Sequence, residues 1–201
     1  MILRIKFIYM TRRIVIATGG TGGHIFPAIS LTNHLKNYDY VIELTTDKRG
    51  IRYLKDYDNI SFKEIPSSPL IKKNILKLVI STFVIVYSIM KSLLFLIFNR
   101  PSIVFGMGGY SSFPICIAAS ILKIKFIIYE NNLVIGKANK FLLPFTKKIF
   151  VSYKDIEGIS DKYKNKVYEV GNIVREEIIN LKNINDQKDI NDDMKILILG
   201  G

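Results

Sequence analysis

The residues best suited to chemistry lie in a glycine-rich run, TGGTGGH, at residues 18–24. Four apolar residues precede it at 14–17, and apolar residues at helical spacing follow it as far as Leu35. Glycines let a backbone approach a ligand closely, and the free N–H groups at the start of a helix favour a phosphate or diphosphate. We therefore expect a strand, an anion-binding loop closed by His24, and a helix that begins at Pro27.

Two common phosphate loops do not match this run. A dinucleotide fingerprint that opens at Gly20 and Gly22 requires a glycine at Ile25, and a P-loop requires a lysine where His24 stands. The run is therefore a glycine loop of another kind. A tight turn without a ligand is the alternative interpretation.

A second glycine-rich run, GMGGYSSFP at residues 106–114, repeats the arrangement of the first. A strand is expected before it at 102–105, and a helix after it at 114–122. A polar turn, Glu130-Asn131-Asn132, follows a further expected strand at 125–129. Because α/β sheets bind ligands at the carboxyl ends of their parallel strands, we expect both loops and this turn to share one edge.

The rest of the chain alternates strands and helices, which is typical of a Rossmann-like, doubly wound parallel α/β sheet. We interpret residues 11–181 as one such domain, preceded by an N-terminal extension at 1–10. A polar linker is expected at 182–194, and 195–201 reads as the first strand of a second domain. The further expected strands lie at 40–45, 60–65, 148–152 and 166–170, and the further helices at 48–57, 71–98 and 136–143.

The composition limits the partners. The net charge of +12 favours anionic partners such as phospholipid surfaces and nucleotide diphosphates. The basic residues are scattered and match no nucleic-acid-binding motif, so nucleic acid is not an expected partner. The single cysteine, Cys116, excludes an intrachain disulfide and is expected to be a buried packing residue. With only two histidines beside it, a Cys/His zinc site is excluded, and no metal is expected.

The most hydrophobic segment, at 71–98, admits three interpretations. It is nearly long enough to span a membrane, but Lys91 would then lie deep in the bilayer at a cost of a few kcal/mol. A helix packed on the core with its outer face against the membrane is the second interpretation, because lysines cluster at one end of the segment. A fully buried helix is the third.

Together the motifs resemble glycosyltransferase family 28, in particular its peptidoglycan N-acetylglucosaminyltransferases. The resemblance rests on GGTGGHIFPA at 19–28, GMGGY at 106–110, ENN at 130–132 and GNIVR at 171–175, in that order. It implies the N-terminal domain of a GT-B glycosyltransferase, peripheral at the cytoplasmic face of the bacterial membrane. Such an enzyme transfers GlcNAc from UDP-GlcNAc to undecaprenyl-diphosphate-MurNAc-pentapeptide (lipid I), forming lipid II with inversion and with no metal or cofactor.

The resemblance also implies roles for single residues. His24 and Glu130 become the catalytic candidates, either of which would deprotonate the acceptor hydroxyl. A structural cap of the loop remains the alternative for His24, and a turn or helix cap the alternative for Glu130. The implied substrate-binding residues are Thr21, Gly22, Gly23, Asn132 and Arg175 toward the donor and Tyr110 toward the acceptor, where Glu130 also lies. Gly108, Gly109 and Asn139 are implied to bind substrate as well.

Two other functions stay open at this point. One is a catalytically inactive half that binds the acceptor or a partner, because nearly all of the expected nucleotide-binding domain is missing from the sequence. A separate C-terminal half would then be a further partner. The other is a GT-B transferase acting on a different lipid acceptor.

Overall fold

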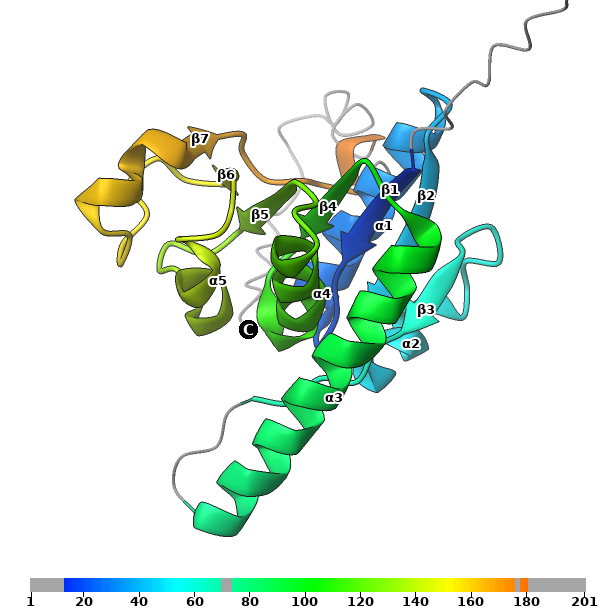
Figure 1. Cartoon of the computed structure of the whole chain (residues 1–201). Helices are drawn as coiled ribbons and strands as arrows, with labels where there is room; N and C mark the ends of the chain where they lie inside the picture. The colour runs from blue at the N-terminus through cyan, green and yellow to red at the C-terminus, as the bar shows by residue number, and fades with distance from the viewer. Residues whose placement is uncertain (1–12, 70–73, 176–177, 181–201) are drawn as a thin grey trace, which may run out of the picture.

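The computed structural model describes residues 13–69, 74–175 and 178–180. Seven strands form one sheet in the order β3-β2-β1-β4-β5-β6-β7, and every neighbouring pair is parallel (Figure 1). The predicted doubly wound parallel α/β sheet is thus confirmed. The strands are β1 (Arg13–Ala17), β2 (Val41–Thr46), β3 (Phe62–Glu64), β4 (Ile103–Gly106), β5 (Phe126–Glu130), β6 (Lys148–Val151) and β7 (Val167–Glu169).

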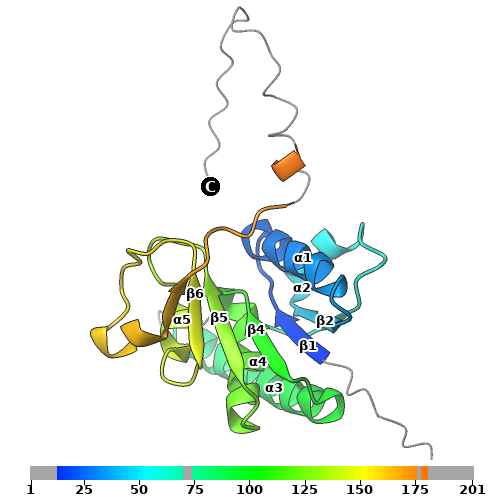
Figure 2. The same ribbon diagram turned by 90° about the horizontal axis from the view of Figure 1, so that it is seen from above.

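Helices cover both faces of the sheet. Those that connect β1, β2 and β3 lie on one face, and those that follow β3 lie on the other (Figure 2). The chain therefore leaves β1 in one direction and β4 in the opposite direction, which makes the gap between these two strands the topological switch point. The helices are α1 (Gly22–Lys36), α2 (Lys48–Leu54), α3 (Ile75–Asn99), α4 (Gly109–Ile121), α5 (Lys137–Leu142) and the short 3-10 helix η1 (Asp161–Lys166).

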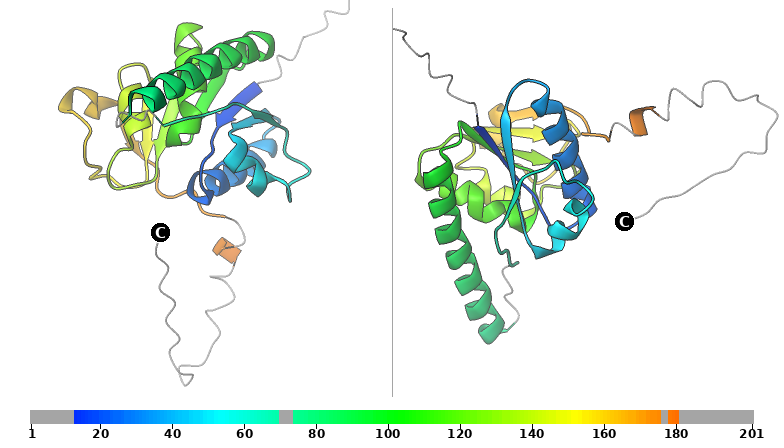
Figure 3. Two further views of the ribbon diagram at one scale, coloured as in Figure 1. Left: turned by 90° about the horizontal axis from the view of Figure 1, so that it is seen from below. Right: turned by 90° about the vertical axis from the view of Figure 1, so that its right-hand side faces the viewer.

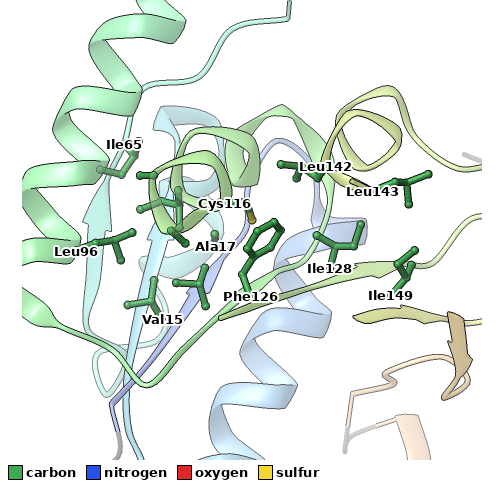
Figure 4. Close-up of a cluster of buried hydrophobic side chains, with 14 of the residues drawn as sticks. Val15, Ala17, Ile65, Leu96, Cys116, Phe126, Ile128, Leu142, Leu143 and Ile149 are labelled. Carbon is green, nitrogen blue, oxygen red and sulfur yellow. The ribbon is translucent and has the colours of Figure 1, made fainter. Parts of the chain in front are cut away.

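Two apolar clusters hold these layers together, one on each face of the sheet. Alternate residues of β1 serve them in turn: Val15 points toward α3, α4 and α5, whereas Ile14 and Ile16 point toward α1 and α2. Figure 4 shows the first cluster, in which Cys116 is fully buried as predicted. Its burial raises the pKa of the thiol, so this cysteine acts as a packing residue.

Both expected helix starts at a proline are wrong by more than one turn. Helix α1 begins at Gly22 and α4 at Gly109, so Pro27 and Pro114 each lie inside a helix, at its sixth residue. Proline has no N–H, and the carbonyl oxygen four residues earlier therefore loses its helical partner. In α1 this oxygen belongs to Gly23, and the side-chain amide of Asn131 donates to it at 3.2 Å. A bond from outside the helix thus replaces the missing one.

Other element limits differ by a few residues from those predicted. The third strand spans only three residues inside the expected 60–65. Helix α4 begins at Gly109, five residues earlier than the predicted start at 114. Helix α2 ends at Leu54 rather than at residue 57. The expected extension at 1–10, linker at 182–194 and strand at 195–201 lie outside the described residues.

Helix α3 is apolar on its exposed side and packs on α4. Its buried residues are Ser81, Ser88, Ser92, Phe95 and Leu96. Its N-terminal half projects beyond the rest of the domain (Figure 3). By length and composition alone, α3 could cross a membrane. The prediction of a fully buried helix is wrong, because only 28% of its most apolar stretch is buried. The large side chains that it exposes are Ile75, Leu76, Val79, Ile80, Phe83, Val86, Tyr87, Met90, Leu94, Ile97 and Phe98.

Candidate active site

The two glycine loops begin side by side at the switch point. Ala17 of β1 pairs with Gly106 of β4, and the Met107 amide donates to the Ala17 carbonyl oxygen at 2.8 Å. Each loop then leads directly into a helix, α1 or α4, whose N-terminus faces the same edge of the sheet. The expectation that both loops share one edge is confirmed.

The second loop makes room for the histidine of the first. A Cβ built on Gly108 would lie 3.1 Å from His24 Cε1, and one built on Gly109 would lie 3.3 Å from His24 Cδ2. Both glycines also have positive φ, of 88° and 73°, which other residues adopt only with strain. Glycine at these two positions therefore lets the imidazole lie flat against the backbone where α4 begins.

His24 sits at the third residue of α1 and is partly buried. Burial lowers the pKa of its imidazole below 6.5, while the nearby Glu130 carboxylate and the Met107 backbone oppose this shift only in part. Nδ1 is buried and has no hydrogen-bond partner within the described part of the chain. At neutral pH the ring is therefore uncharged and able to accept a proton.

A pocket of about 170 Å³ opens beside this histidine. It is smaller than the roughly 300 Å³ or more that encloses a whole small ligand, so it can take only part of a large substrate. Six of the residues predicted from the sequence meet here. The lining consists of His24, Gly109, Tyr110, Glu130, Asn132, Gly136, Lys137, Ala138 and Asn139.

Glu130 ends β5 with its carboxylate 98% buried and occupied by four donors. Oε1 accepts from the backbone and side-chain amides of Asn132 at 3.2 and 2.6 Å, and Oε2 accepts from the Gly136 amide at 2.8 Å and Asn139 Nδ2 at 3.0 Å. These bonds fold the turn after β5 and fix the start of α5. The geometry favours a positioning role for Glu130, and its catalytic role stays a prediction.

Asn139 lines the pocket in a fixed orientation. Its Nδ2 donates to the Tyr129 carbonyl oxygen and to Glu130, both at 3.0 Å, which fixes the orientation of the amide. Oδ1 is buried and has no partner among the described residues. An unpaired buried acceptor is costly, so this amide is a candidate functional group of the site.

Four predicted donor-side residues lie outside this pocket. Thr21, the N-cap of α1, makes no side-chain capping bond, so the amides of Gly22 and Gly23 in the first turn stay uncapped. Arg175, beyond β7, is exposed and lies over the Phe26 ring at 4.6 Å from its centroid. A Cβ on Gly22 would lie 2.9 Å from the Phe26 ring. Glycine at this position therefore leaves room for the ring that Arg175 covers.

Three supporting residues escaped the sequence analysis. Asn131 secures the first turn of α1, as described above, and Lys137 brings a cation to the pocket. Asp47 lies beneath the first loop and accepts a hydrogen bond from the Gly20 amide. A signal for Asp47 was available, because it directly follows the second strand and so had to lie at the ligand-binding edge of the sheet.

The comparisons with known proteins identify the family and the fold. Residues 14–151 match the glycosyltransferase family 28 N-terminal domain. Over 193 residues, 96% of this chain, 35% of positions are identical to the UDP-N-acetylglucosamine–N-acetylmuramyl-(pentapeptide) pyrophosphoryl-undecaprenol N-acetylglucosamine transferase of Pelagibacter ubique, of which 52% is covered. The transferase of the same name from Rickettsia felis is 33% identical over 92% of this chain and 49% of its own length.

Solved structures show the same architecture. The crystal structure of Acinetobacter baumannii MurG matches with a TM-score of 0.64 and 26% identity over 79% of this chain and 45% of its own. A UDP-GlcNAc 2-epimerase from Neisseria meningitidis, bound to UDP-GlcNAc, shares the fold at a TM-score of 0.59 and 16% identity over 87% of this chain and 50% of its own. The chain spans about half the length of the curated relatives it matches. It belongs to glycosyltransferase family 28, whose N-terminal domain it contains.

Proposed function

We propose that this chain is the acceptor-binding domain of a UDP-GlcNAc-dependent N-acetylglucosaminyltransferase. The acceptor is lipid I, and the product is lipid II of peptidoglycan biosynthesis. The names of the relatives from Pelagibacter and Rickettsia support the reaction. The observation that carries the proposal is the pocket at the switch point, where a neutral His24 lines one small space together with Tyr110 and Asn139.

The anionic part of the acceptor is assigned to the start of α1, so Gly22 and Gly23, which the resemblance places on the donor side, would bind the acceptor as well. Their amides have no side-chain cap there, and the positive end of the helix dipole favours the diphosphate. The sugar hydroxyl that reacts then reaches the pocket beside the imidazole. Tyr110 and Asn139, from α4 and α5, bound this pocket and orient the sugar.

In the proposed reaction the acceptor hydroxyl attacks the anomeric carbon of GlcNAc from the face opposite UDP. A bond forms between that carbon and the hydroxyl oxygen, and the bond from the carbon to the UDP β-phosphate oxygen breaks. The hydroxyl proton passes to His24, and UDP leaves with its electron pair. His24 is a better base than Glu130, since all four bonds to the Glu130 carboxylate already come from the protein.

The donor is assigned mainly to a second domain. Thr21, Asn132 and Arg175 are proposed to contact the donor from this domain: Asn132 lines the pocket, Thr21 is the N-cap of α1, and Arg175 lies over the Phe26 ring. A pocket of about 170 Å³ leaves most of both substrates uncovered, so a second half, in the same chain or a separate one, has to complete the site.

Helix α3 is proposed to hold the domain at an anionic phospholipid surface, peripheral on the cytoplasmic face. Its projecting half exposes Ile75, Leu76, Ile80 and Phe83, with Lys77 beside them. An apolar face flanked by basic residues lies stably in the headgroup region. Peripheral docking fits better than a membrane span, because Ser88, Ser92 and Leu96 hold the other half of α3 against the domain.

The small size of the pocket favours a second candidate function, an acceptor-binding half without activity of its own, because about 170 Å³ encloses only part of the substrates. Transfer of labelled GlcNAc from UDP-GlcNAc to a soluble lipid I analogue separates the two. The purified chain is assayed alone and with a separately produced C-terminal half, using His24→Ala and His34→Ala as site and control variants. Turnover with the added half that His24→Ala abolishes and His34→Ala preserves supports the transferase. No turnover with the added half, despite acceptor binding, supports the binding half.

A further inference from the structure

Asp47 connects more segments than any helix cap requires. Its side chain caps α2 through the Gly50 amide at 3.0 Å, and the same oxygen, Oδ1, accepts from the Gly20 amide in the first glycine loop at 3.1 Å. The second oxygen, Oδ2, accepts from Arg49 Nε and Nη2 at 2.9 and 2.7 Å and from the Ser67 hydroxyl at 2.8 Å. One buried carboxylate thus joins α2, the β1–α1 loop and the segment after β3.

The first glycine loop is closely packed at Gly19. A Cβ on Gly19 would lie 2.5 Å from Ser111 Oγ of α4 and 3.1 Å from Asp47 Oδ1. Ser111 Oγ in turn lies 3.2 Å from Ser67 Oγ, which connects α4 to the Asp47 group. Gly19 and Gly20 both have positive φ, of 151° and 83°, a backbone conformation that glycine adopts without strain.

The Gly20 bond decides which way the loop amides face. Gly20 donates inward to Asp47, and Thr21 donates back to the Gly19 carbonyl oxygen at 3.2 Å. Gly22 and Gly23 follow directly and are left uncapped at the surface. The Arg49 side chain stays 52% exposed, and Nη2 lies 3.5 Å from where a Cβ of Gly20 would be. The Gly20–Asp47 bond thus fixes the loop immediately before the two uncapped amides of α1.

We propose that Asp47 is a positioning residue of the transferase: it holds Gly20 and Arg49 so that the first glycine loop presents the amides of Gly22 and Gly23 to a substrate diphosphate. This inference rests on the proposed function for the identity of the ligand, since both the lipid-linked acceptor and the UDP-sugar donor carry a diphosphate. Asp47 itself touches neither substrate.

The test separates loop positioning from helix capping. Serine is a preferred N-cap, so Asp47→Ser keeps the cap of α2 but is too short to hold Gly20 as well. Asp47→Asn retains an oxygen that can accept from both Gly20 and Gly50. Asp161→Ser is the matched control, because Asp161 also pairs with a cation at 2.7 Å but is fully exposed, in η1.

Two readouts are taken on the full chain under conditions where circular dichroism shows each variant to be folded. The first is hydrogen exchange of the Gly20 amide. The second is the affinity for inorganic pyrophosphate, a soluble lipid I analogue and UDP-GlcNAc, measured separately so that the source of the diphosphate is identified. For Asp47→Ser we expect Gly20 to exchange about 10-fold faster or more, and the affinity for the bound diphosphate to fall by a similar factor, because a charge-assisted hydrogen bond is lost.

Asp47→Asn is expected to restore both values toward wild type, and Asp161→Ser to leave both unchanged. A folded Asp47→Ser variant with wild-type Gly20 exchange and wild-type affinity would overturn the inference. If the wild-type chain binds none of the three probes while Gly20 exchange responds as expected, the proposed function fails and the control of the loop by Asp47 still holds.

Discussion

The imidazole of His24 and the backbone of Gly109 come from different βα units and lie in contact, with only 3.3 Å between His24 Cδ2 and the place of a Gly109 Cβ. The two glycine loops are therefore one structure. The first supplies the uncapped helix amides and the histidine, and the second supplies the glycine surface against which the histidine rests. This division of roles explains why similar runs follow both β1 and β4.

Gly109→Ala should displace His24 and abolish transfer in the complemented assay. The methyl group would press on the imidazole, and a non-glycine residue at φ 73° costs about 1–2 kcal/mol by itself. Gly171→Ala is the matched control, since Gly171 has φ 76° and its Cβ would meet nothing within 4 Å. Both variants should lose similar stability to urea, and only Gly109→Ala should lose transfer. Equal activity of the two variants would show that the contact between Gly109 and His24 does not affect transfer.

Transfer should decline as the pH falls through the pKa of His24. Burial lowers this pKa below 6.5, so the ring is neutral and competent at pH 7 and becomes protonated only in more acidic solution. The imidazole titration followed by NMR, with His24→Ala to assign the signal, should give the same midpoint as the acidic limb of kcat/KM. A midpoint that does not follow the His24 titration would remove His24 as the base.

Asn131→Ala should destabilise the fold by about 1 kcal/mol, the usual net contribution of one hydrogen bond, since the Gly23 carbonyl oxygen loses its donor. Urea unfolding of the chain measures this change. Asn165→Ala, at an exposed position of η1, is the control and should be neutral. If the two substitutions cost the same, the bond that replaces the one lost at Pro27 contributes nothing.

These two prolines also show what the sequence could and could not predict. Strand periodicity predicted all seven strands, and the glycine runs predicted the edge of the sheet that holds the site. The predicted helix starts at Pro27 and Pro114 were wrong because proline is common at a first helical position, whereas both lie at the sixth residue of a helix. In α1 a donor from outside the helix compensates for the N–H that Pro27 lacks. That donor, Asn131, is 108 residues from Gly23, and no local pattern connects them.

The same limit applies to the site. His24, Gly109, Tyr110, Glu130, Asn132 and Asn139 were predicted and do share one pocket. Two of the four donors to the Glu130 carboxylate, the Gly136 amide and Asn139 Nδ2, reach it only because the chain turns back after β5. The spacing of residues in the sequence does not determine the shape of this turn. Contact between His24 and the second loop depends on β1 and β4 being neighbours although 85 residues of chain separate Ala17 from residue 103.

Acid should weaken the fold through Asp47. Hydrogen bonds from Arg49, Ser67, Gly20 and Gly50 outweigh its burial and lower its pKa from 3.8 to about 2. A carboxylate whose pKa is lower in the folded than in the unfolded chain stabilises the fold at any pH above the unfolded-state pKa. This contribution, ~2 kcal/mol, is lost as the pH falls from about 4 to about 2. The urea midpoint of the wild type should therefore drop more steeply over this range than that of Asp47→Asn. Parallel curves would contradict the assignment.

Phe83→Glu should reduce binding to vesicles that contain anionic phospholipid. Phe83 is 72% exposed on the projecting part of α3, and withdrawing one such ring from the membrane forfeits about 1.5–3 kcal/mol, or roughly 10- to 100-fold in affinity. Tyr38→Glu adds the same charge at another exposed aromatic residue, away from α3, and should bind as the wild type does. Cosedimentation measures both. If Tyr38→Glu lost vesicle binding and Phe83→Glu kept it, the membrane contact would lie outside α3.

The most direct test of the central claim is calorimetric binding of a soluble lipid I analogue to the purified chain, with His24→Ala, Asn139→Asp and UDP-GlcNAc as comparisons. We predict that the wild type binds the acceptor analogue and binds UDP-GlcNAc much more weakly. Asn139→Asp should bind the analogue about 10-fold more weakly, because the new carboxylate lacks the Nδ2 donor to Glu130 and lies beside the Glu130 carboxylate. A folded wild-type chain that binds UDP-GlcNAc but not the acceptor analogue would contradict the assignment of this domain to the acceptor.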